Sequence, residues 1–292
     1  RSLLSLGFEQ LVIDGAELDI RRTADGQLQI AGLSLSATDQ GNTAFADWAF
    51  EQTELVLRGG LLRWTDETKE APPLVLTDVV GVLRNPGQRH LLRIDATPPA
   101  AWGERFSVRA LLRQPLLSGS GSSWKTWSGQ LYSEFSRADV SQLKRYISPE
   151  DFGIDVSSGQ GALRVWADVA DGEFSGVTAD VALSGVSTRL ARELQPLTLA
   201  SLGGRFSGQQ RVNGFDFQTE GLAFKAVDGL VWPGGNVALV HTGVEGRLPA
   251  KTELKADKLD LAALARIAKR LPLDAAAHRL LESFAPEGLV ER

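Results

Sequence analysis

The chain has 292 residues, of which 43% are hydrophobic and 23% are charged, and its formal net charge is −5 at pH 7. This composition is typical of a folded globular protein with a sizeable core, and it argues against intrinsic disorder. It also argues against a nucleic-acid partner, because affinity for phosphate backbones needs clustered cations and the sequence has no block of lysines and arginines.

The chain contains no cysteine and no methionine. The first absence excludes disulfides, thiolate catalysis and cysteine metal sites, and it fits either a reducing or an oxidising compartment. The second predicts an internal piece of a longer or processed protein. No apolar run approaches the roughly 18 residues that a membrane-spanning helix needs, and no signal peptide opens the chain. We therefore expect any anchor to lie upstream of Arg1.

Short strands with one apolar face are predicted over residues 3–35. The alternation is clear at Leu18 and Ile20, which are flanked by charged side chains. Asp14-Gly15 and Asp25-Gly26 are pairs that tolerate positive φ in tight hairpins, so we expect the strands on either side of each pair to be antiparallel.

A weaker copy of these strands follows a polar stretch. The segment FEQLVIDGAELDIRR (residues 8–22) resembles FEQTELVLRGGLLRWTD (residues 50–66), with one small insertion. In this alignment Asp14-Gly15 corresponds to Arg58-Gly59. The first 66 residues are therefore predicted to contain the same hairpin twice.

The alternation continues over residues 72–112, and strands resume over residues 163–183. Residues 118–123 (SGSGSS) suit either an interdomain linker or an ordinary loop. Glycine, proline, asparagine and aspartate mark the remaining predicted turns. These turns are Asn85-Pro86-Gly87, Pro98-Pro99, Asp171-Gly172, Gly203-Gly204, Asn213-Gly214, Asp228-Gly229 and Pro233-Gly234-Gly235.

Two segments run from a strand into a short amphipathic helix and align without a gap. They are GQLYSEFSRADVSQLKRYI (residues 129–147) and KADKLDLAALARIAKRL (residues 255–271). Asp139 and Asp260 occupy matching N-cap positions, where a carboxylate accepts from the first-turn N–H groups. We predict that the two helices pack in equivalent ways, and that a third helix spans residues 274–284.

Nearly every strand is apolar on one face and polar on the other, which is typical of antiparallel sheets with one wet side. Three short helices cannot cover the dry side of roughly fifteen strands, which at about 4.8 Å spacing form a sheet about 70 Å long. The predicted fold class is mainly β: a long curled antiparallel sheet, or repeating β-groove, with a few short amphipathic helices. A β-sandwich with a self-buried core is the alternative.

The repeats suggest a division into three parts. Residues 1–126 hold β-groove units, residues 127–245 hold a strand–helix unit followed by β-groove strands, and residues 246–292 hold a second strand–helix unit that starts the next repeat.

Catalytic and metal-binding motifs are missing from the sequence. The histidines lack metal-ligand spacing and are expected to be solvated: His90, His241 and His278. Two carboxylate pairs keep a glycosidase alternative open: Asp151 with Asp155, and Glu67 with Glu70. The seven tryptophans suit sheet core or rim positions. We expect no enzyme activity, no metal and no cofactor.

Five segments in one order carry a family resemblance: ELVLRGGLLRWTDE, GALRVWADVADGEF, LQPLTLASLGGRF, GLVWPGG and KLDLAALARIAKRLPL. Together they resemble the YhdP-type branch of the AsmA-like proteins, over most of the chain. The resemblance implies a Gram-negative envelope protein that is anchored in the inner membrane and reaches across the periplasm toward the outer membrane. Its fold would be a β-groove like those of AsmA, TamB and the chorein-type bridge proteins.

The resemblance also implies lipid transport without catalytic residues. Its partners would be phospholipid acyl chains, neighbouring repeats of the same chain and envelope proteins at the ends of the bridge, with a non-catalytic envelope scaffold as the alternative. We expect the lining of the groove to comprise the apolar residues of the alternating strands. These are Leu18, Ile20, Leu28, Ile30, Leu55, Leu57, Leu62, Trp64, Val80, Val82, Leu163, Val165, Val181 and Leu183.

Overall fold

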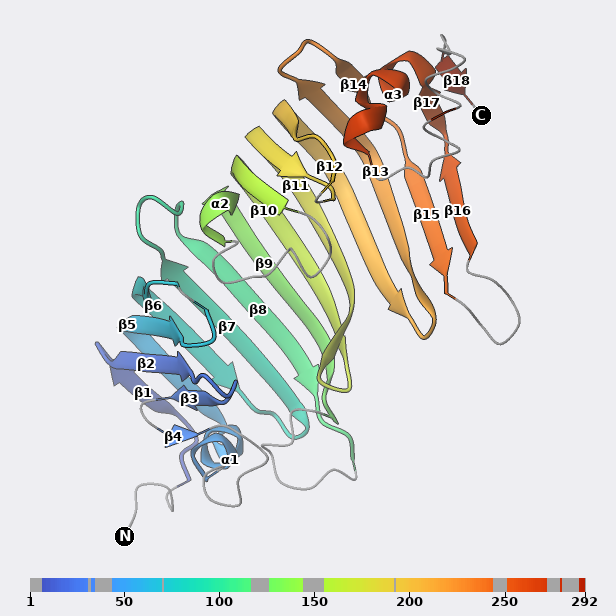
Figure 1. Ribbon diagram of the computed structural model, residues 1–292. Helices are drawn as coiled ribbons and strands as arrows, with labels where there is room; N and C mark the ends of the chain where they lie inside the picture. The colour runs from blue at the N-terminus through green and yellow to red at the C-terminus, as the bar shows by residue number, and fades with distance from the viewer. Residues whose placement is uncertain are drawn as a thin grey trace. The chain divides into compact units, whose positions relative to one another are not determined.

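A computed structural model describes residues 7–30, 33–34, 44–69, 71–116, 126–143, 155–191, 193–243, 251–271, 279 and 289–291. Strands dominate it (Figure 1): β1 Leu11–Asp14, β2 Glu17–Arg22, β3 Leu28–Ile30, β4 Leu33–Ser34, β5 Glu54–Asp66, β6 Leu74–Arg84, β7 Arg89–Thr97, β8 Phe106–Arg113, β9 Ser128–Asp139, β10 Asp155–Ala170, β11 Glu173–Arg189, β12 Leu197–Arg211, β13 Gly214–Ala226, β14 Val231–Pro233, β15 Val237–Thr242, β16 Lys251–Ala256, β17 Lys258–Asp260 and β18 Leu289–Glu291. The helical segments are short: α1 Ala44–Glu51, α2 Val140–Leu143, α3 Leu261–Ile267 and the 3₁₀ turn η4 Ala268–Arg270.

Sixteen strands form one open sheet in which sequential strands are neighbours. The hydrogen-bonded order is β16-β15-β13-β12-β11-β10-β9-β8-β7-β6-β5-β2-β3-β4, with β1 on β5 and β14 on β13. The other sheet within the described ranges has only two strands, β17 and β18. The prediction of one long sheet is therefore confirmed, and the sandwich alternative is wrong because the described residues form no second sheet of comparable size.

The chain divides into two compact units. Unit 1 comprises residues 1–136 and 165–175, and unit 2 comprises residues 137–164 and 176–292. This partition follows contacts rather than sequence repeats, so the predicted repeat boundaries after residues 126 and 245 stay a prediction.

The two copies recognised in the first 66 residues lie side by side in unit 1. β1 and β2 both pair with β5 in parallel at one constant offset, with Leu11 opposite Leu55 and Leu18 opposite Leu62. This register is the one that the sequence alignment gives. The predicted hairpin at Asp14-Gly15 is wrong, however, because the chain keeps its direction from β1 through this pair into β2. The matching strand β5 likewise keeps its direction through Gly59. The sheet is consequently mixed, with antiparallel pairs from β5 to β9 and from β11 to β16.

Glycines inside long strands were mistaken for turns. Gly59 has a φ of 56° and lies where the β5–β6 register shifts. Gly203-Gly204 lies within β12 at a second shift, opposite Gly221 in β13, whose φ is 60°. Strands of 13 to 17 residues bend at such bulges, and glycine accommodates the positive φ. The other predicted turns fall between strands, and β2 and β3 form the antiparallel hairpin expected at Asp25-Gly26.

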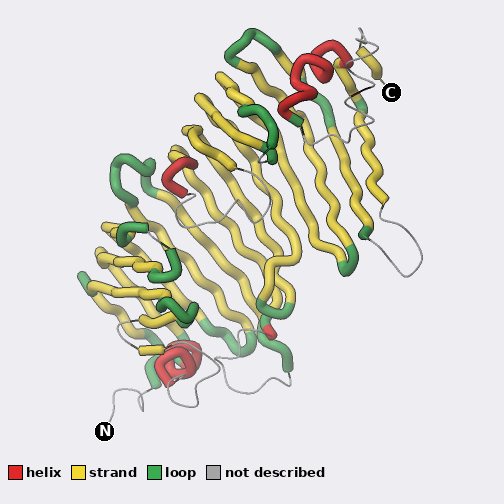
Figure 2. The backbone as a smooth tube through the Cα atoms, in the orientation of Figure 1, coloured by secondary structure: helices red, strands yellow, loops and turns green. Residues whose placement is uncertain are grey.

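Helix α1 was missed by the sequence analysis, which treated Phe50 as the start of a strand copy. Its C-terminal carbonyl groups are satisfied by side chains: Asn85 Nδ2 donates to Ala49 O (3.1 Å) and Gln52 O (2.8 Å). Gln52 is buried and accepts from the backbone N–H of Phe8 at 2.7 Å. Helix ends need such partners, and these bonds fix α1 at the strand ends of unit 1 (Figure 2).

A buried aromatic cluster lies beside α1. The rings of His90 and Trp127 stack at 4.0 Å, and Phe50 meets both edge-on at 5.1 and 4.8 Å. Asn85 Oδ1 lies 2.8 Å from His90 Nδ1. His90 is only 4% exposed, so the expectation of a solvated imidazole is wrong for it. Burial lowers the pKa of His90, and a hydrogen bond with Gln114 acts in the opposite direction.

The two predicted helix N-caps are confirmed. Asp139 Oδ1 accepts from Ser141 N at 2.9 Å, and Asp260 Oδ1 accepts from Ala263 N at 2.8 Å. Whether the two helices pack equivalently stays a prediction, because the side chain of Leu143 lies outside the described residues. The third predicted helix also stays a prediction, because Arg279 is its only residue among those described. The segment SGSGSS lies wholly outside the described residues.

We predict that acid destabilises unit 1 through His90. Its folded pKa lies below its ordinary value of 6.5, so the unfolded chain binds the proton more readily. His90 therefore contributes its full stability above pH 6.5 and loses it as the pH falls through the folded pKa. Thermal melts between pH 7.5 and 5 should show a smaller loss of stability in His90→Phe, which keeps the stack but cannot titrate. Equal acid sensitivity in both proteins would contradict this role.

Candidate functional site: an apolar sheet face

The cross-strand register of unit 2 defines one continuous apolar face. Leu183 lies opposite Leu202, which lies opposite Phe224. Further along the same strands Ala179 lies opposite Phe206, and the register shift between β12 and β13 at Gly203/Arg205 keeps Phe217 on the same face as Phe224. The residues on this face, called here the apolar face of unit 2, run from β11 to β16: Val177, Ala179, Val181, Leu183, Leu202, Phe206, Phe215, Phe217, Phe224, Val237, Leu239 and Leu254.

One end of this face is covered by α3 and η4. Ala263 and Ile267 are 5% and 3% exposed and pack in a cluster with strand residues. The other buried residues of the cluster include Leu230, in the β13–β14 turn, and the strand residues Val186, Leu197, Leu199, Phe224, Ala226 and Trp232. Asp228 in the β13–β14 turn reaches Arg270 (3.1 Å) and Arg266 (3.8 Å). The helix is therefore held to the sheet by apolar packing and by exposed ion pairs.

The other end of the face is bare. Phe217 is 38% exposed and Leu254 is 58% exposed, although both side chains point to the same side as the buried cluster. The rings of Phe206 and Phe217 lie 6.4 Å apart, so the exposed side chains are contiguous. Soluble proteins rarely leave such patches uncovered. The geometry thus provides a surface for an apolar ligand.

The opposite face of unit 2 carries charge. Arg205 donates from Nε and Nη2 to the two carboxylate oxygens of Asp180, at 2.6 and 3.0 Å. These hydrogen bonds are the main cause that lowers the pKa of Asp180. Glu220 lies opposite Arg205 on the next strand. This face is therefore stable in water.

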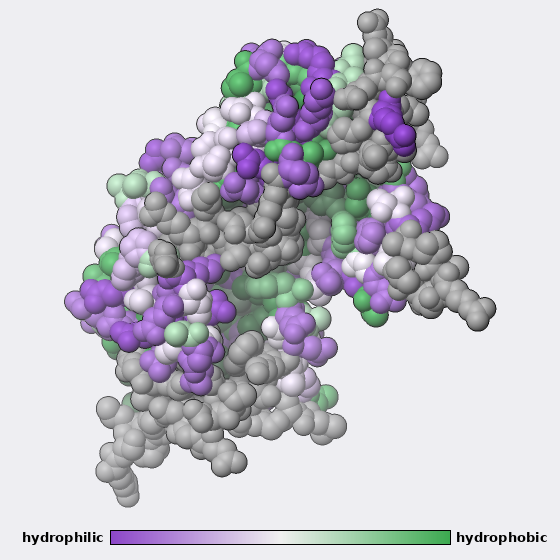
Figure 3. Space-filling view, in the orientation of Figure 1, coloured by the Kyte–Doolittle hydropathy of each residue, from purple (hydrophilic) through white to green (hydrophobic). Residues whose placement is uncertain are grey.

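Unit 1 repeats the arrangement with a partly self-buried apolar face. Val79 and Ala96 are 2% and 0% exposed, because Leu57, Leu62 and neighbouring apolar side chains pack over them. Figure 3 shows apolar side chains gathered in a hollow in unit 1, bordered by hydrophilic ones.

Most predicted lining residues of unit 1 share this face. Leu18, Ile20, Ile30, Leu55, Leu57, Leu62 and Trp64 are related by cross-strand pairing and by the two-residue period. Val80 and Val82 lie on the opposite face, where they pair with Asp95 and Arg93. The cause is the bulge at Asp78, whose φ is 48° and which reverses the alternation within β6. The side chain of Leu28 lies outside the described residues.

In unit 2, Val181 and Leu183 belong to the apolar face, and Leu163 lies on β10 four residues from Gly159. A Cβ at Gly159 would lie 3.3 Å from Cγ2 of Val186, which is part of the α3-covered cluster. Because alternate residues of a strand share a face, Leu163 lies on the same side of β10 as this contact. Val165 continues the half-buried positions of β10 but belongs to unit 1. Six apolar-face residues were not predicted from the sequence, although their alternation with polar residues was readable: the exposed Val177, Phe215, Phe217 and Leu254 and the half-buried Phe206 and Leu239.

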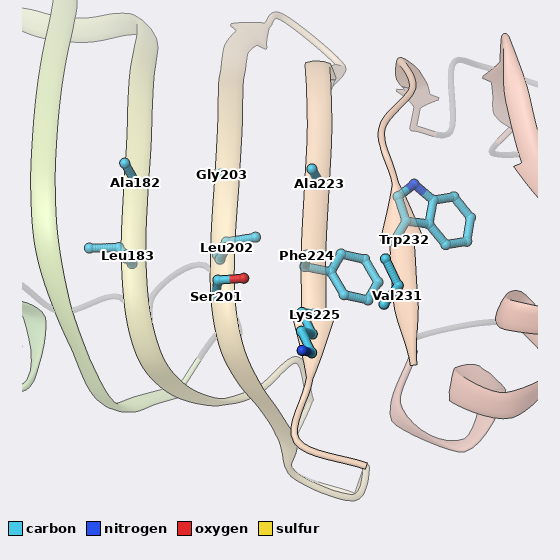
Figure 4. A pocket seen from close by; sticks show the side chains of 10 residues that line it. All are labelled: Ala182, Leu183, Ser201, Leu202, Gly203, Ala223, Phe224, Lys225, Val231 and Trp232. Carbon is cyan, nitrogen blue, oxygen red and sulfur yellow. The ribbon is translucent and has the colours of Figure 1, made fainter. Parts of the chain in front are cut away.

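Unit 2 also contains a shallow hollow of about 490 Å³, shown in Figure 4. It is lined by neighbouring residues of β11 to β14, including the cross-strand partners Ala182, Gly203 and Ala223. Lys225 and Val231 are exposed and are the strand neighbours of the buried Phe224 and Trp232. Because neighbouring side chains of a strand alternate in direction, Lys225 and Val231 point to the side of the sheet opposite the apolar face. The hollow is therefore separate from the bare end of the apolar face.

The described ranges contain no group of three or more metal-ligating side chains. Each predicted carboxylate pair has one member, Asp151 or Glu70, outside them. His241 lies on β15 with Nδ1 2.9 Å from Thr252 Oγ1, and His278 is not among the described residues. None of the helices searched in the described part of the chain is long and apolar enough to cross a membrane.

Comparison with known proteins identifies a family. A family model described as YhdP protein matches residues 2–292. No curated protein and no solved structure matches the chain.

We predict that the bare end of the apolar face is accessible in the folded protein. The chain has no cysteine, so single substitutions report on one position each. Leu254→Cys should react with a maleimide like a free thiol, because Leu254 is 58% exposed. Leu199→Cys, at a position 3% exposed beneath α3, should react roughly 100-fold more slowly because labelling needs local opening. Mass spectrometry follows both rates, and equal rates would contradict an open end.

Proposed function

This chain belongs to the YhdP family, and from that premise we propose that it is a segment of a bridge-like envelope protein that carries phospholipid across the periplasm. The acyl chains would lie on the apolar sheet face, and the head groups would stay in water at its border. The observation that supports the proposal is the contiguous, solvent-open row that contains Phe217 and Leu254 on an otherwise folded sheet.

The energetics favour such a surface. Exposing an acyl chain of about 15 methylenes to water costs on the order of 12 kcal/mol, at about 0.8 kcal/mol per methylene. A continuous apolar surface removes most of this barrier. Binding must also be uniform enough for a chain to slide, and the row Val177, Phe217, Leu239 and Leu254 carries no polar side chain.

The proposal includes the location and the partners of the protein. The bridge would be anchored in the inner membrane and reach toward the outer membrane of a Gram-negative cell. This chain would continue into neighbouring repeats, and envelope proteins would bind the ends of the bridge. No catalytic step is needed, since an acyl chain moves without making or breaking a covalent bond.

The test exploits adjacent residues on opposite faces of β13. Phe217→Asp places a charge on the apolar face, where partial exposure lets it reach water, so the free energy of unfolding should fall by only about 1–2 kcal/mol. Cross-linking to a phospholipid with a photo-activatable acyl chain should be lost. Gln218→Asp, on the polar face, is the matched control and should cross-link like the parent. Leu163→Asp extends the test to β10.

Two results would contradict transport. Equal cross-linking of Phe217→Asp and Gln218→Asp would show that the apolar face is not the binding surface. Failure of the parent to capture lipid, together with loss of the cooperative melt in both Phe217→Asp and Leu163→Asp, would instead favour the scaffold with a self-buried core, because a buried unpaired charge costs several kcal/mol.

A further inference from the structure

The apolar face of unit 2 ends in a row of different chemistry. One pairing step beyond Phe217 and Leu239, the register places four residues side by side: Gln210, Phe215, His241 and Thr252. Three of them carry hydrogen-bonding side chains. This row is called here the polar border, and it is the last row of the apolar face before the β12–β13 turn.

The imidazole in this row is held in place. Thr252 Oγ1 lies 2.9 Å from His241 Nδ1, and the Phe215 ring stacks on the imidazole at 5.3 Å with an interplanar angle of 29°. The hydrogen-bonding contact occupies Nδ1, and the stacked phenyl ring covers one face of the imidazole. Nε2, the second hydrogen-bonding atom, forms no hydrogen bond within the ranges that the structure describes.

Next to the polar border lies the exposed part of the apolar face, called here the apolar strip, which is represented on β11 by Val177, Ala179 and Val181. Rows on a strand repeat every two residues, at about 3.4 Å per residue, so Val177, Ala179 and Val181 span about 14 Å. Beyond them the face is covered by α3. The exposed strip is therefore bounded on one side by polar groups and on the other by a helix.

We propose that the polar border binds the head group of a phospholipid whose acyl chains lie on the adjacent strip. His241, Thr252 and Gln210 supply hydrogen bonds to phosphate or ester oxygens, and Phe217, Leu239 and Leu254 contact the chains. The arrangement matches an amphiphile, because apolar and polar surfaces meet along one line. This inference rests on the proposed function and assigns the orientation of the lipid in unit 2.

The test compares two probes with the same photo-activatable alkyl chain: a phospholipid and a hydrocarbon without a head group. His241→Leu combined with Thr252→Val should reduce phospholipid capture roughly five- to tenfold, as expected for two lost hydrogen bonds. Hydrocarbon capture should stay at the level of the parent. His241→Gln, which keeps a donor, should retain phospholipid capture, and Thr242→Val, on the opposite face of β15, should match the parent for both probes.

Equal phospholipid capture by the parent and the double variant would overturn the head-group site while leaving the proposed function in place. Parallel loss of both probes with an intact thermal melt would overturn it as well, since the row would then act on the chains. Displacement of the phospholipid by inorganic phosphate alone would point to a free-anion site and overturn the proposal. Failure of the parent to capture either probe would reject the proposed function itself.

Discussion

The structure depends on one constraint: a β-strand places every second side chain on the same face, and here that face is apolar on strand after strand. A sheet with one apolar face must bury it against another layer. The described chain supplies only short helices for this purpose, and α3 covers one end of the apolar face in unit 2. The uncovered remainder is the feature from which both proposals follow.

The bulges preserve this constraint over long strands. A strand of 15 residues such as β12 has to bend. A shift of its pairing register by one residue would move its remaining apolar side chains to the solvent-exposed face. Gly221 lies where β13 has one residue more than β12, opposite Gly204, so Phe217 and Phe224 stay on one face although they are seven residues apart. In β6 the bulge at Asp78 lies beside the register shift at Gly59 of β5, and it leaves Val80 and Val82 on the charged face. Glycine pairs therefore help to decide which residues line the apolar surface.

Much of the architecture was readable from the sequence. The two-residue alternation predicted the strands and their order. The repeated segment was predicted as two hairpins, and its alignment has the same offset as the parallel register between β1, β2 and β5. Aspartates before apolar helix residues predicted both N-caps. Each of these features is local, or is carried by direct similarity between two segments, so it needs no knowledge of distant contacts.

The remainder depended on contacts that a sequence pattern does not contain. Asp14-Gly15 suits a hairpin by its own chemistry, yet pairing with Arg58 keeps the chain running in one direction. His90 has no local sign of burial, and it is buried because α1 and Trp127 fold over it. The lining residues were predicted by alternation alone, and Val80 was included because the bulge at Asp78 leaves no mark on that pattern.

The most direct measurement of the central claim is native mass spectrometry of this chain after production in a Gram-negative periplasm and purification without detergent. If the apolar face holds acyl chains, the spectrum should show the chain with added masses of phospholipids, and extraction with organic solvent should release those lipids. Only the bare mass of the chain, with no lipid in the extract, would contradict the account.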